Sequence, residues 1–520
     1  MRARRTFHHS YGFAGVALIF LAPVLVITGC TIAPPSVRDT AKLVRVGEDE
    51  AKGLDPQSIS DLASLRIAAD QFEGLTRFDA RGHAEAGLAS SWQASSDGLK
   101  WQFTLRRGLR FSDGVPITPA TFVSVYERLR APATASPVAE LFEALSAVKA
   151  RGNAVIVTLN HPLPALPELM AHPAISALPL HRAGWVNERP MITSGAYRLQ
   201  NWALADHIDL VTNPSWHDGK PAIAHIEWRP VTDILAAMRL FQAGAADTVG
   251  DIPSARLASL KAKHPAAVHI APFLGSYYFA FNTRHAPFDD VRVRRALSMA
   301  VERDWIANSL IATGVQPAWG IIPPGTSGLT PYRPDWSRWP RVRRLAAAKA
   351  LLAKAGYGPT RALIFDIRFN SDIDHRRISV ALAAFWKPLN VEARLLNSEA
   401  SLHFASLRRA DFALARSGWI GDLSVPENFL AVHRSNGGPI NYSGFANVGY
   451  DAALDKALLL ADPIARAGAM RAAEAMLVEE SPILPLYYYV SKSLVSPRVA
   501  GWQDNAANIH PSRTLRIVAR

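Results

Sequence analysis

Hydrophobic and polar residues alternate with a period of two in several short parts of the chain, and this alternation predicts β-strands. Residues 43–46, 101–105 and 153–160 follow the pattern, and a longer alternating stretch extends from 194 to 230. Between these segments, apolar residues recur at a spacing of three to four, which predicts helices that bury one face. Strands and helices therefore interleave along the chain, and this order predicts an α/β fold.

Several of the predicted helices have recognisable first residues. Thr118 and Pro119 begin a helix that extends to Leu129, and Asp289-Asp290 precede a helix whose apolar positions share one face. Asp462-Pro463 combine an N-cap with a first-turn proline. Further helices are predicted over 234–243, 344–355, 451–461 and 464–480, and buried aromatic strands over 277–282 and 483–490.

The N-terminal residues have the pattern of an export signal. Residues 1–10 contain three arginines and no acidic residue, and residues 11–28 are almost wholly apolar. Residues 27–30, Ile-Thr-Gly-Cys, resemble the lipobox of bacterial lipoproteins, and a linker with two prolines follows at 33–36. The resemblance implies a signal peptide over 1–29, a lipidated N-terminus at Cys30 with a linker to residue 40, and an extracytoplasmic location at a membrane. An uncleaved membrane helix is the alternative, because the apolar run approaches the ~18 residues that span a bilayer.

Composition restricts the architecture and the partners. A chain of 520 residues is too long for one core, so two or three lobes are expected. The formal charge is +13, which would suit nucleic acid or an anionic membrane. Because the sequence shows no dense block of lysine and arginine, a dispersed, solvated charge is the preferred interpretation, and no nucleic-acid partner is expected.

Sequence motifs of the common enzyme classes are missing. The chain has no Gly-rich phosphate loop ending in Lys-Ser/Thr and no Gly-x-Ser-x-Gly elbow. Its single cysteine is the candidate lipidation site, and its 16 histidines are scattered without the spacing of a zinc site. These observations favour a binding protein over an enzyme, and no cofactor or metal is expected.

Nine separated segments carry a family resemblance, through their order and spacing rather than through any one of them. The segments are 71–75, 87–92, 97–101, 111–118, 133–137, 194–197, 287–294, 415–419 and 486–490. Together they resemble the extracytoplasmic solute-binding proteins of peptide-importing ABC transporters (family 5), particularly the oligopeptide-binding members. The resemblance extends from about residue 43 to the C-terminus.

The resemblance implies an α/β fold of the periplasmic-binding-protein type II kind, a three-lobed clam with a hinge. Lobe I would be discontinuous, with residues 41–74, 193–282 and 488–520. Lobe II would be residues 75–192, and lobe III residues 283–487. The hinge crossings would lie near Asn282-Thr283 and Tyr488, where strands end in loops that can absorb backbone rotation.

In this family an extended peptide is bound through its backbone and its termini. The resemblance implies that two strands pair with the peptide, Ser60-Asp61-Leu62 and Gly418-Trp419-Ile420. Asp422 matches the aspartate that receives the peptide amine. Its alternative role is that of an acidic residue before a helix, although residues 424–427 form a capping-box pattern of their own, in which Ser424 can be the cap.

Other residues are implied by position. Arg416 and His375 match basic residues that receive the peptide carboxylate, and Trp419 matches a pocket wall. Tyr278 and Tyr488 match tyrosines that line the cleft, with core packing as the rival interpretation for both. Where relatives have a second pocket tryptophan, a pocket tyrosine and a cleft glutamate, this chain has Ala400, Val138 and Ser60. Some relatives also have a disulfide at the positions of Gly275 and Ile420.

The expected function is therefore that of a monomeric, lipid-anchored peptide receptor, which delivers its ligand to the permease and ATPase subunits of an ABC importer. Receptors for murein peptides, dipeptides or another solute remain alternatives within the same class. A peptide-sensing surface lipoprotein without transport is an alternative from another class, and an extracytoplasmic hydrolase is a third. The preferred peptide length and sequence do not follow from the resemblance.

Overall fold

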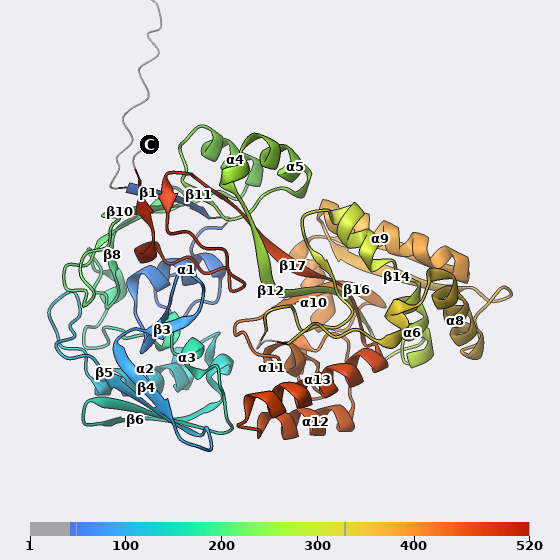
Figure 1. The fold of residues 1–520 in the computed structure, drawn as a ribbon, viewed down its shortest axis with the longest axis horizontal. Coiled ribbons are helices and arrows are strands. Elements are labelled where there is room, and N and C mark those ends of the chain that lie inside the picture. The colour runs from blue at the N-terminus through green and yellow to red at the C-terminus, as the bar shows by residue number, and fades with distance from the viewer. Residues whose placement is uncertain (1–41, 48, 327–328, 519–520) are drawn as a thin grey trace, which may run out of the picture. The chain divides into compact units, whose positions relative to one another are not determined.

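The computed structural model describes residues 42–47, 49–326 and 329–518, and its largest feature is a mixed β-sheet (Figure 1). Within these residues the sheet contains eleven strands in the order β15-β14-β16-β12-β17-β11-β1-β10-β9-β8, and β13 pairs with β17. The bounds are β1 Lys42–Gly47, β8 Tyr197–Ala203, β9 His207–Thr212, β10 His225–Pro230, β11 Thr248–Val249, β12 Val268–Phe281, β13 Gln316–Pro317, β14 Leu363–Asn370, β15 Val391–Ser398, β16 Leu414–Ile420 and β17 Ile483–Val495.

Strand β1 lies inside this sheet, parallel to its neighbours β10 and β11. Its four central residues are all buried, including Arg45. The Arg45 guanidinium donates to Ser512 Oγ at 2.7 Å and lies 4.4 Å from the centroid of the Trp228 ring. The predicted strand at 43–46 is confirmed, and so is the alternating stretch at 194–230, which forms β8, β9 and β10.

Strands β12 and β17 are the longest described, with 14 and 13 residues, and they pair antiparallel. The sequence predicted only their inner ends, at 277–282 and 483–490. The pairing shifts register between Pro272 and Ser276, and such an irregularity accommodates a proline, which has no N–H to donate. Tyr488 lies inside β17, so the expectation that a strand ends at this position is wrong.

A separate antiparallel sheet has the order β4-β5-β7-β6, and helix α2 packs against it. Apolar side chains of the sheet and the helix, among them Phe103, Phe122 and Val125, are buried in one core. The helix begins after Thr118, whose N–H donates to Thr121 Oγ1 at 3.1 Å. The predicted strands at 101–105 and 153–160 and the predicted helix are confirmed. The bounds are β4 Ala89–Ala94, β5 Lys100–Leu105, β6 Leu145–Arg151, β7 Ala154–Leu159 and α2 Pro119–Arg130, and the short pairs are β2 Thr76–Phe78 with β3 Ala84–Ala86 and β18 Val499–Ala500 with β19 Arg516–Ile517.

The remaining helices agree with the sequence mainly where a cap residue marks the start. Asp290 and Asp462 cap α6 and α13 as predicted. Helices α8 and α12 begin three residues earlier than predicted, at Arg341 and Val448. The bounds are α1 Leu62–Gln71, α3 Leu166–Leu169, α4 Ile234–Gln242, α5 Ser254–Lys263, α6 Val291–Ala300, α7 Arg303–Trp305, α8 Arg341–Lys354, α9 Ile373–Trp386, α10 Ala400–Arg408, α11 Glu427–Leu430, α12 Val448–Leu458 and α13 Pro463–Glu480, and residues Ile306–Ile311 form a π-helix, η6.

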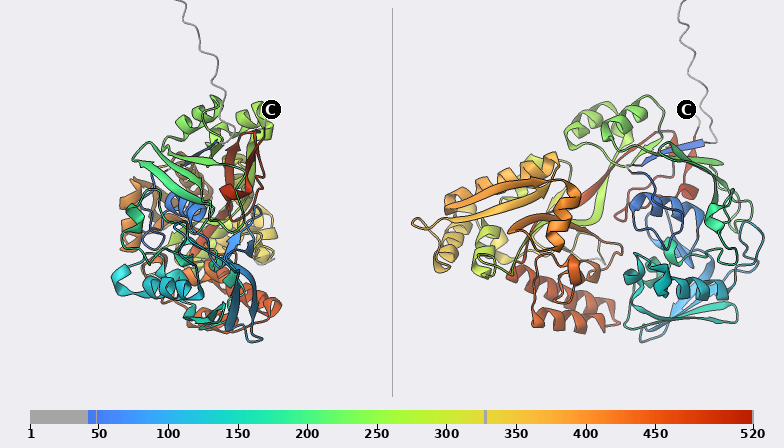
Figure 2. Two further views of the ribbon diagram at one scale, coloured as in Figure 1. Left: turned by 90° about the vertical axis from the view of Figure 1, so that its left-hand side faces the viewer. Right: turned by 180° about the vertical axis from the view of Figure 1, so that it is seen from behind.

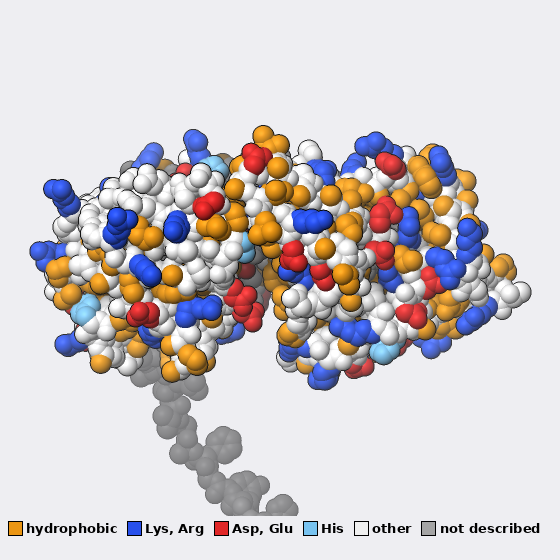
Figure 3. Space-filling view, turned by 90° about the horizontal axis from the view of Figure 1, so that it is seen from below, with side chains coloured by type: hydrophobic (Ala, Val, Ile, Leu, Met, Phe, Trp, Pro, Cys, Tyr) orange, Lys and Arg blue, Asp and Glu red, His pale blue; other side chains and the backbone are white. Residues whose placement is uncertain are grey.

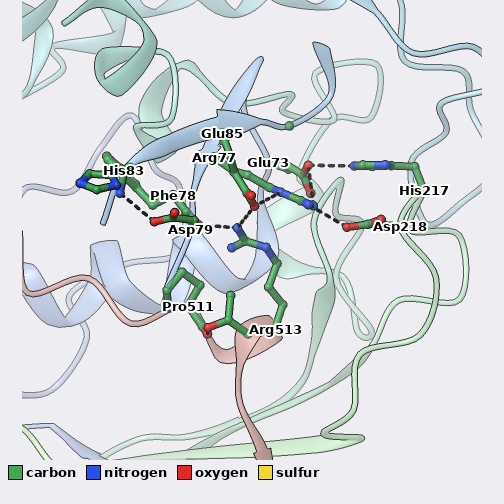
Figure 4. A network of polar contacts seen from close by, with 12 residues as sticks. Glu73, Arg77, Phe78, Asp79, His83, Glu85, His217, Asp218, Pro511 and Arg513 are labelled. Atoms are coloured by element: carbon green, nitrogen blue, oxygen red, sulfur yellow. Dashed lines mark hydrogen bonds and ion pairs between the residues drawn. The ribbon is translucent and has the colours of Figure 1, made fainter. Parts of the chain in front are cut away.

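A network of charged groups joins segments that are far apart in the sequence (Figure 4). Arg77 on β2 bonds Glu85 at 2.9 Å and Asp218 at 2.7 Å. Glu85 also forms an ion pair with Arg513 of the C-terminal segment, at 3.0 Å. The Glu73 Oε1 atom lies 2.8 Å from His217 Nε2, within hydrogen-bond distance. The network holds β2, β3, the loop after β9 and the C-terminal residues together.

Figure 2 shows α12 and α13 side by side in further views, in agreement with their contacts. Figure 3 shows a hollow on the face that is seen from below in Figure 1, between the side with the four-stranded sheet and the side with α12 and α13. Strand β16 leads into a loop whose Leu423 and Val425 are buried in the core that also contains the four-stranded sheet. This loop therefore connects the two sides.

Candidate functional site

Arg416 on β16 lies among tyrosines from two neighbouring strands. Gly418 lies opposite Tyr277 of β12, and Tyr277 lies opposite Tyr487 of β17. The rings of Tyr277 and Tyr487 stack with centroids 4.6 Å apart, and Tyr489 meets both edge-on. Arg416 Nη2 donates to the Tyr489 hydroxyl at 3.1 Å, and the guanidinium carbon is 5.1 Å from the centroid of the Tyr277 ring. We call Arg416, Tyr277, Tyr487 and Tyr489 the arginine–tyrosine cluster.

Among the described residues, the Arg416 guanidinium has no carboxylate as a counter-ion. Burial by itself lowers the pKa of Arg416, but the hydroxyls of Tyr489, Tyr277 and Tyr487 outweigh it and raise the pKa above the usual value. No described carboxylate is paired with Arg416. Its Nη1 is 3.5 Å from Asn370 Oδ1, and its Nε is buried without a hydrogen-bond partner in the described residues. A buried cation is costly without an opposite charge, so this arrangement suits an anionic ligand.

His375 extends the cluster from the first turn of α9. Its Nδ1 lies 3.2 Å from the Tyr277 hydroxyl and 3.4 Å from Asp372 Oδ1. Burial, together with the positive charge of Arg416, lowers the pKa of His375 to about 3. The imidazole is therefore uncharged at neutral pH and offers a hydrogen bond rather than a second positive charge. Its contact with a peptide carboxylate stays a prediction.

The second half of β16 has a free edge. Strand β14 pairs only with Leu414 and Ala415, at the start of β16. Residues 416–420 have β12 on one side, and no described strand pairs with them on the other. An unpaired edge offers backbone N–H and C=O groups to an added strand.

The direction of these backbone groups follows from the strand alternation. The N–H of Gly421 donates to a carbonyl of β12 at 2.8 Å. Since successive residues alternate in an antiparallel pair, the N–H and C=O groups of Arg416, Gly418 and Ile420 point away from β12. In agreement, the Arg416 carbonyl lies 2.9 Å from His403 Nε2 on the outer side. Gly418 and Ile420 therefore present main-chain groups at the free edge, as predicted for a peptide-pairing strand.

Asp422 follows β16 in a loop and places a second uncompensated charge near this edge. Its side chain is open to solvent, but much protein surrounds it, and this desolvation raises the pKa of the carboxyl above its usual value. Its backbone N–H donates to Asn428 Oδ1 at 3.0 Å. No described lysine, arginine or histidine is paired with the Asp422 carboxylate. A cationic ligand group would find a carboxylate there that has no competing partner.

The loop that carries Asp422 is anchored at several points. Leu423 and Val425 are buried in the core that contains β1 and α2, and the Ser424 N–H donates to Glu168 Oε2 of α3 at 3.1 Å. Helix α11 begins at Glu427 without a side-chain cap. The capping-box interpretation of Ser424 is therefore wrong, because the residue at the N-cap position of α11 is Pro426 and not Ser424.

Residues 60–62 do not form a strand, so this prediction is wrong. Asp61 is the N-cap of α1, and its Oδ1 accepts the Ser64 N–H at 2.9 Å. Ser60 precedes the cap in an exposed loop, and Leu62 is the first helical residue. A carboxylate that can cap a following turn favours helix initiation over strand continuation. Leu62 lines a pocket of about 70 Å³, and a contact of these three residues with a peptide stays a prediction.

Three further predicted residues lie on the opposite face of the sheet from Arg416. Trp419 follows Gly418 and packs against the core that contains Tyr278, while Tyr488 is also buried. Because side chains alternate along a strand, Tyr277, Tyr487 and Tyr489 form the cluster instead. Tyr278 and Tyr488 are buried on the other face, which fits their core interpretation, and a contact of either residue with a peptide stays a prediction. Trp419 is only partly buried, and its role as a pocket wall stays a prediction.

The sequence reasoning did not identify Tyr277, Asn370 and Glu168. Tyr277 could have been found from the alternation in β12, since it shares a face with Gly418 across the strand pair. Asn370 and Glu168 have no local signal, because each depends on a contact with a distant segment. Among the described residues no cluster of histidine, cysteine and acidic side chains could hold a metal ion.

Two further sequence predictions concern the pair Gly275 and Ile420, and the N-terminal Cys30. Gly275 and Ile420, where some relatives have a disulfide, are paired opposite each other in β12 and β16. Cys30 lies outside the described residues, as does the segment interpreted as a signal peptide. In the part of the chain that the structure describes, no helix is long and apolar enough to cross a membrane.

Comparison with known proteins matches nearly the whole chain. The family model of the bacterial extracellular solute-binding proteins, family 5 Middle, matches residues 83–440. The periplasmic oligopeptide-binding protein OppA of Salmonella typhimurium is 32% identical over 96% of this chain and 96% of its own length. The periplasmic murein peptide-binding protein MppA of Escherichia coli is 33% identical over 92% of this chain and 93% of its own.

Solved structures extend the match to three dimensions. The Escherichia coli murein tripeptide-binding protein MppA superposes with a TM-score of 0.80 at 31% identity, covering 93% of this chain and 99% of that one. OppA of Haemophilus influenzae, in complex with RPPGFSPFR, gives a TM-score of 0.79 at 27% identity over 92% and 99%. The α/β fold of the type II periplasmic-binding-protein kind, expected from the sequence, is confirmed.

Proposed function

Because the chain belongs to the bacterial extracellular solute-binding proteins of family 5, we propose that it is an extracytoplasmic receptor that captures oligopeptides for an ABC importer. Members of this family are substrate-binding receptors rather than enzymes, which agrees with the missing enzyme motifs. The observation that carries the proposal is the edge of β16, which no described strand pairs, with charges of opposite sign at its two ends that have no ion-pair partner among the described residues. Arg416 lies at one end and Asp422 just beyond the other.

A peptide supplies the complementary groups. Its main chain pairs with Gly418 and Ile420, its amine meets the Asp422 carboxylate, and its carboxylate meets the Arg416 guanidinium. This places the peptide antiparallel to β16. Six residue steps separate the two charged residues, about 20 Å at 3.3 Å per residue, so a peptide of about three to five residues fits between them once the charged side chains extend inward.

Side-chain specificity would come from the surfaces around this edge. The backbone and terminal contacts do not depend on sequence, so many peptides of suitable length are accommodated. In place of the pocket tryptophan, tyrosine and glutamate of some relatives, Ala400, Val138 and Ser60 leave more room and one acidic contact fewer. The receptor therefore selects peptides mainly by length and by free termini.

The three-lobed arrangement belongs to the same proposal. Lobe II and the first two segments of lobe I share one hydrophobic core, and the network of Figure 4 crosses their boundary. Closure therefore moves lobe III against these two, with β12 and β17 as the connecting strands. The register irregularity between Pro272 and Ser276 is the part of β12 best suited to bend, because it has fewer ladder hydrogen bonds.

Anchoring and delivery complete the function. The lipobox at Cys30 would tether the receptor to a membrane, which keeps a captured peptide close to the permease. The similarity to the murein peptide-binding protein MppA makes murein peptides one candidate ligand class for this chain. Murein peptides also combine a free amine with carboxylates.

Native mass spectrometry of the purified protein tests the ligand class directly. We expect peptides of mixed sequence and a narrow range of lengths to co-purify with the protein. An added tripeptide should displace them and should itself remain uncleaved. A non-peptide ligand, or cleavage of the added peptide, would contradict the proposal. Peptides with the cross-linking residues of murein would support the murein-peptide alternative within the same class.

A further inference from the structure

An open apolar pocket lies on the exposed face of α9, between this helix and the segment formed by α7 and η6. Its volume is about 410 Å³. We call it the α9 pocket, and its principal lining residues are Trp305, Leu310, Ile373, Arg376, Arg377 and Val380. None of these residues belongs to the peptide site described above.

Three large apolar side chains that line the pocket are exposed. Ile373 is 75% exposed, Val380 51% and Trp305 46%. Single exposed apolar residues are common, but a contiguous group around a concave surface is typical of an interaction site. Trp305 is held in place by an edge-on contact with Phe385, with ring centroids 5.8 Å apart.

One wall of the pocket has an unusual backbone. Leu310 belongs to η6, the π-helix over Ile306–Ile311. A π-helix is less stable than an α-helix, is rare, and frequently occurs at functional sites. Its presence beside exposed apolar residues is a second observation, independent of exposure, that points to a function for this surface.

Both walls are connected to strands of the peptide site. In α9, His375 lies two residues from Ile373 and contacts Tyr277 of the arginine–tyrosine cluster. In α7, Arg303 lies two residues from Trp305, and its Nε donates to the Pro485 carbonyl of β17 at 2.7 Å. A carboxylate bound at Arg416 changes the surroundings of His375, so the position of α9, and with it the pocket, can depend on peptide occupancy.

We propose that the α9 pocket is the docking site for an extracytoplasmic segment of the permease, which presents an apolar side chain beside an acidic one. This inference rests on the proposed function, because it requires a permease partner. The apolar side chain would occupy the space between Trp305 and Val380. The acidic group would pair with Arg376, which has no ion-pair partner among the described residues, whereas Arg377 is already bonded to Asp374 at 2.9 Å.

Val380→Asp in the full-length chain is the principal test. It places a charge in the pocket without changing any residue of the peptide site. We expect the affinity of the purified protein for a tripeptide to stay within about twofold, while uptake of the same tripeptide by cells lacking the native gene falls at least about tenfold. Val342→Asp is the matched control, because Val342 on α8 is 81% exposed and lies outside the pocket, and uptake should be unchanged.

A second variant tests the charge. Arg376→Glu should reduce uptake, again with unchanged peptide affinity and an unchanged unfolding temperature, whereas Arg376→Lys should retain most of it. Normal uptake with both Val380→Asp and Arg376→Glu would overturn the docking site. A parallel loss of peptide affinity would also overturn it, because the pocket would then act through the ligand site.

The failure of the proposed function would look different. In that case the unaltered chain would itself give no uptake, or would bind no peptide, and the docking inference would be refuted together with it. Sedimentation analysis adds a further outcome. Dimerisation of the unaltered protein that Val380→Asp abolishes would assign the pocket to a second copy of the chain and would overturn the permease assignment.

Discussion

At the scale of single residues, the site is defined by charges that the protein leaves without partners. Buried arginines elsewhere are bonded to carbonyls or carboxylates; Arg303, for example, bonds Pro485 and Ser298. Arg416 instead contacts tyrosine hydroxyls and Asn370, none of which carries a negative charge at neutral pH. Asp422 is similarly without a cation in the described residues. A largely buried cation such as Arg416 costs free energy in the empty receptor, and a bound carboxylate would offset that cost.

Asp422→Asn should weaken binding of a peptide with a free amine by about 30-fold or more, because one partner of a charge pair is lost. The same peptide with an acetylated amine should bind both proteins equally, which isothermal titration calorimetry can measure. Equal loss for the two peptides would show that Asp422 acts on the fold of its loop.

The pH dependence of the same interaction has a defined sign. Desolvation raises the pKa of Asp422, so the carboxyl becomes protonated at a higher pH than an ordinary aspartate, near 3.9. A neutral carboxyl does not attract an ammonium group. Affinity for the free-amine peptide should therefore decline on acidification at a higher pH than for an exposed aspartate, while Asp422→Asn should show no such decline.

Glu474 provides a residue-scale prediction about stability. This buried residue of α13 accepts the N–H groups of Ile321 and Ile322, both at 2.9 Å, and burial raises its pKa to about 7. Folding thus favours the protonated carboxyl. The contribution of Glu474 to the free energy of unfolding is therefore fully present below pH 4.5 and is lost as the pH rises through about 7. Glu474→Gln should increase stability at pH 8 by up to about 3 kcal/mol and leave it unchanged near pH 4.5 in urea unfolding. Equal effects at the two pH values would contradict this.

At the scale of elements, the parity of strands decides which predictions were correct. Gly418 and Tyr277 share a face across β16 and β12, whereas Tyr278, which the resemblance matched to a cleft-lining position, lies opposite Ser417 on the other face. An offset of one residue moves a side chain to the opposite face. Caps were more dependable, since Asp290 and Asp462 act locally, but the resemblance placed Asp61 in a strand, and its role as the N-cap of α1 was not identified.

Gly418 is the residue of β16 that permits the cluster to form. A Cβ at this position would lie 2.6 Å from the Tyr489 hydroxyl and 3.1 Å from the Ser276 carbonyl. Gly418→Ala should therefore displace Tyr489 from Arg416 and lower stability by about 1–3 kcal/mol, as measured by urea unfolding.

Tyr489→Phe is the matched partner for this test, because it removes the closest atom. Gly418→Ala should cost less in the Tyr489→Phe background than alone, so the double variant should lose less stability than the sum of the two single losses. Additive effects would show that the Ser276 carbonyl, rather than Tyr489, requires the glycine.

At the scale of the whole molecule, the chain combines one continuous core with a second region connected through long strands. Residues from β1, the four-stranded sheet and the loop at Leu423 and Val425 belong to the same hydrophobic cluster. The other clusters surround β12, β14 and α13. The loop that carries Asp422 therefore belongs to the expected lobe III by sequence, but it packs in the core of β1 and the four-stranded sheet. A ligand that contacts Asp422 would thus contact both regions.

Cys30→Ser tests the anchoring at this scale. Without the sulfur, no thioether to a lipid can form, so the protein should move from the membrane fraction to the soluble or weakly bound fraction after cell fractionation. Peptide affinity should be unchanged, because the described site lies far along the chain from the lipobox. Retention of the variant in the membrane after a high-salt wash would favour an uncleaved N-terminal helix.

Periodicity and caps are local in the chain, so they predicted the alternating α/β order and the helix starts at Thr118, Asp290 and Asp462. Family motifs pointed to Arg416, His375, Gly418 and Asp422, whose contacts with a peptide stay predictions. Only the tertiary structure decided which charges remain unpaired, which edge of β16 is free, and that Tyr277 rather than Tyr278 accompanies Arg416. These properties depend on strands brought together from distant segments. Whether a group has a partner is a matter of what packs beside it, and no local pattern encodes that.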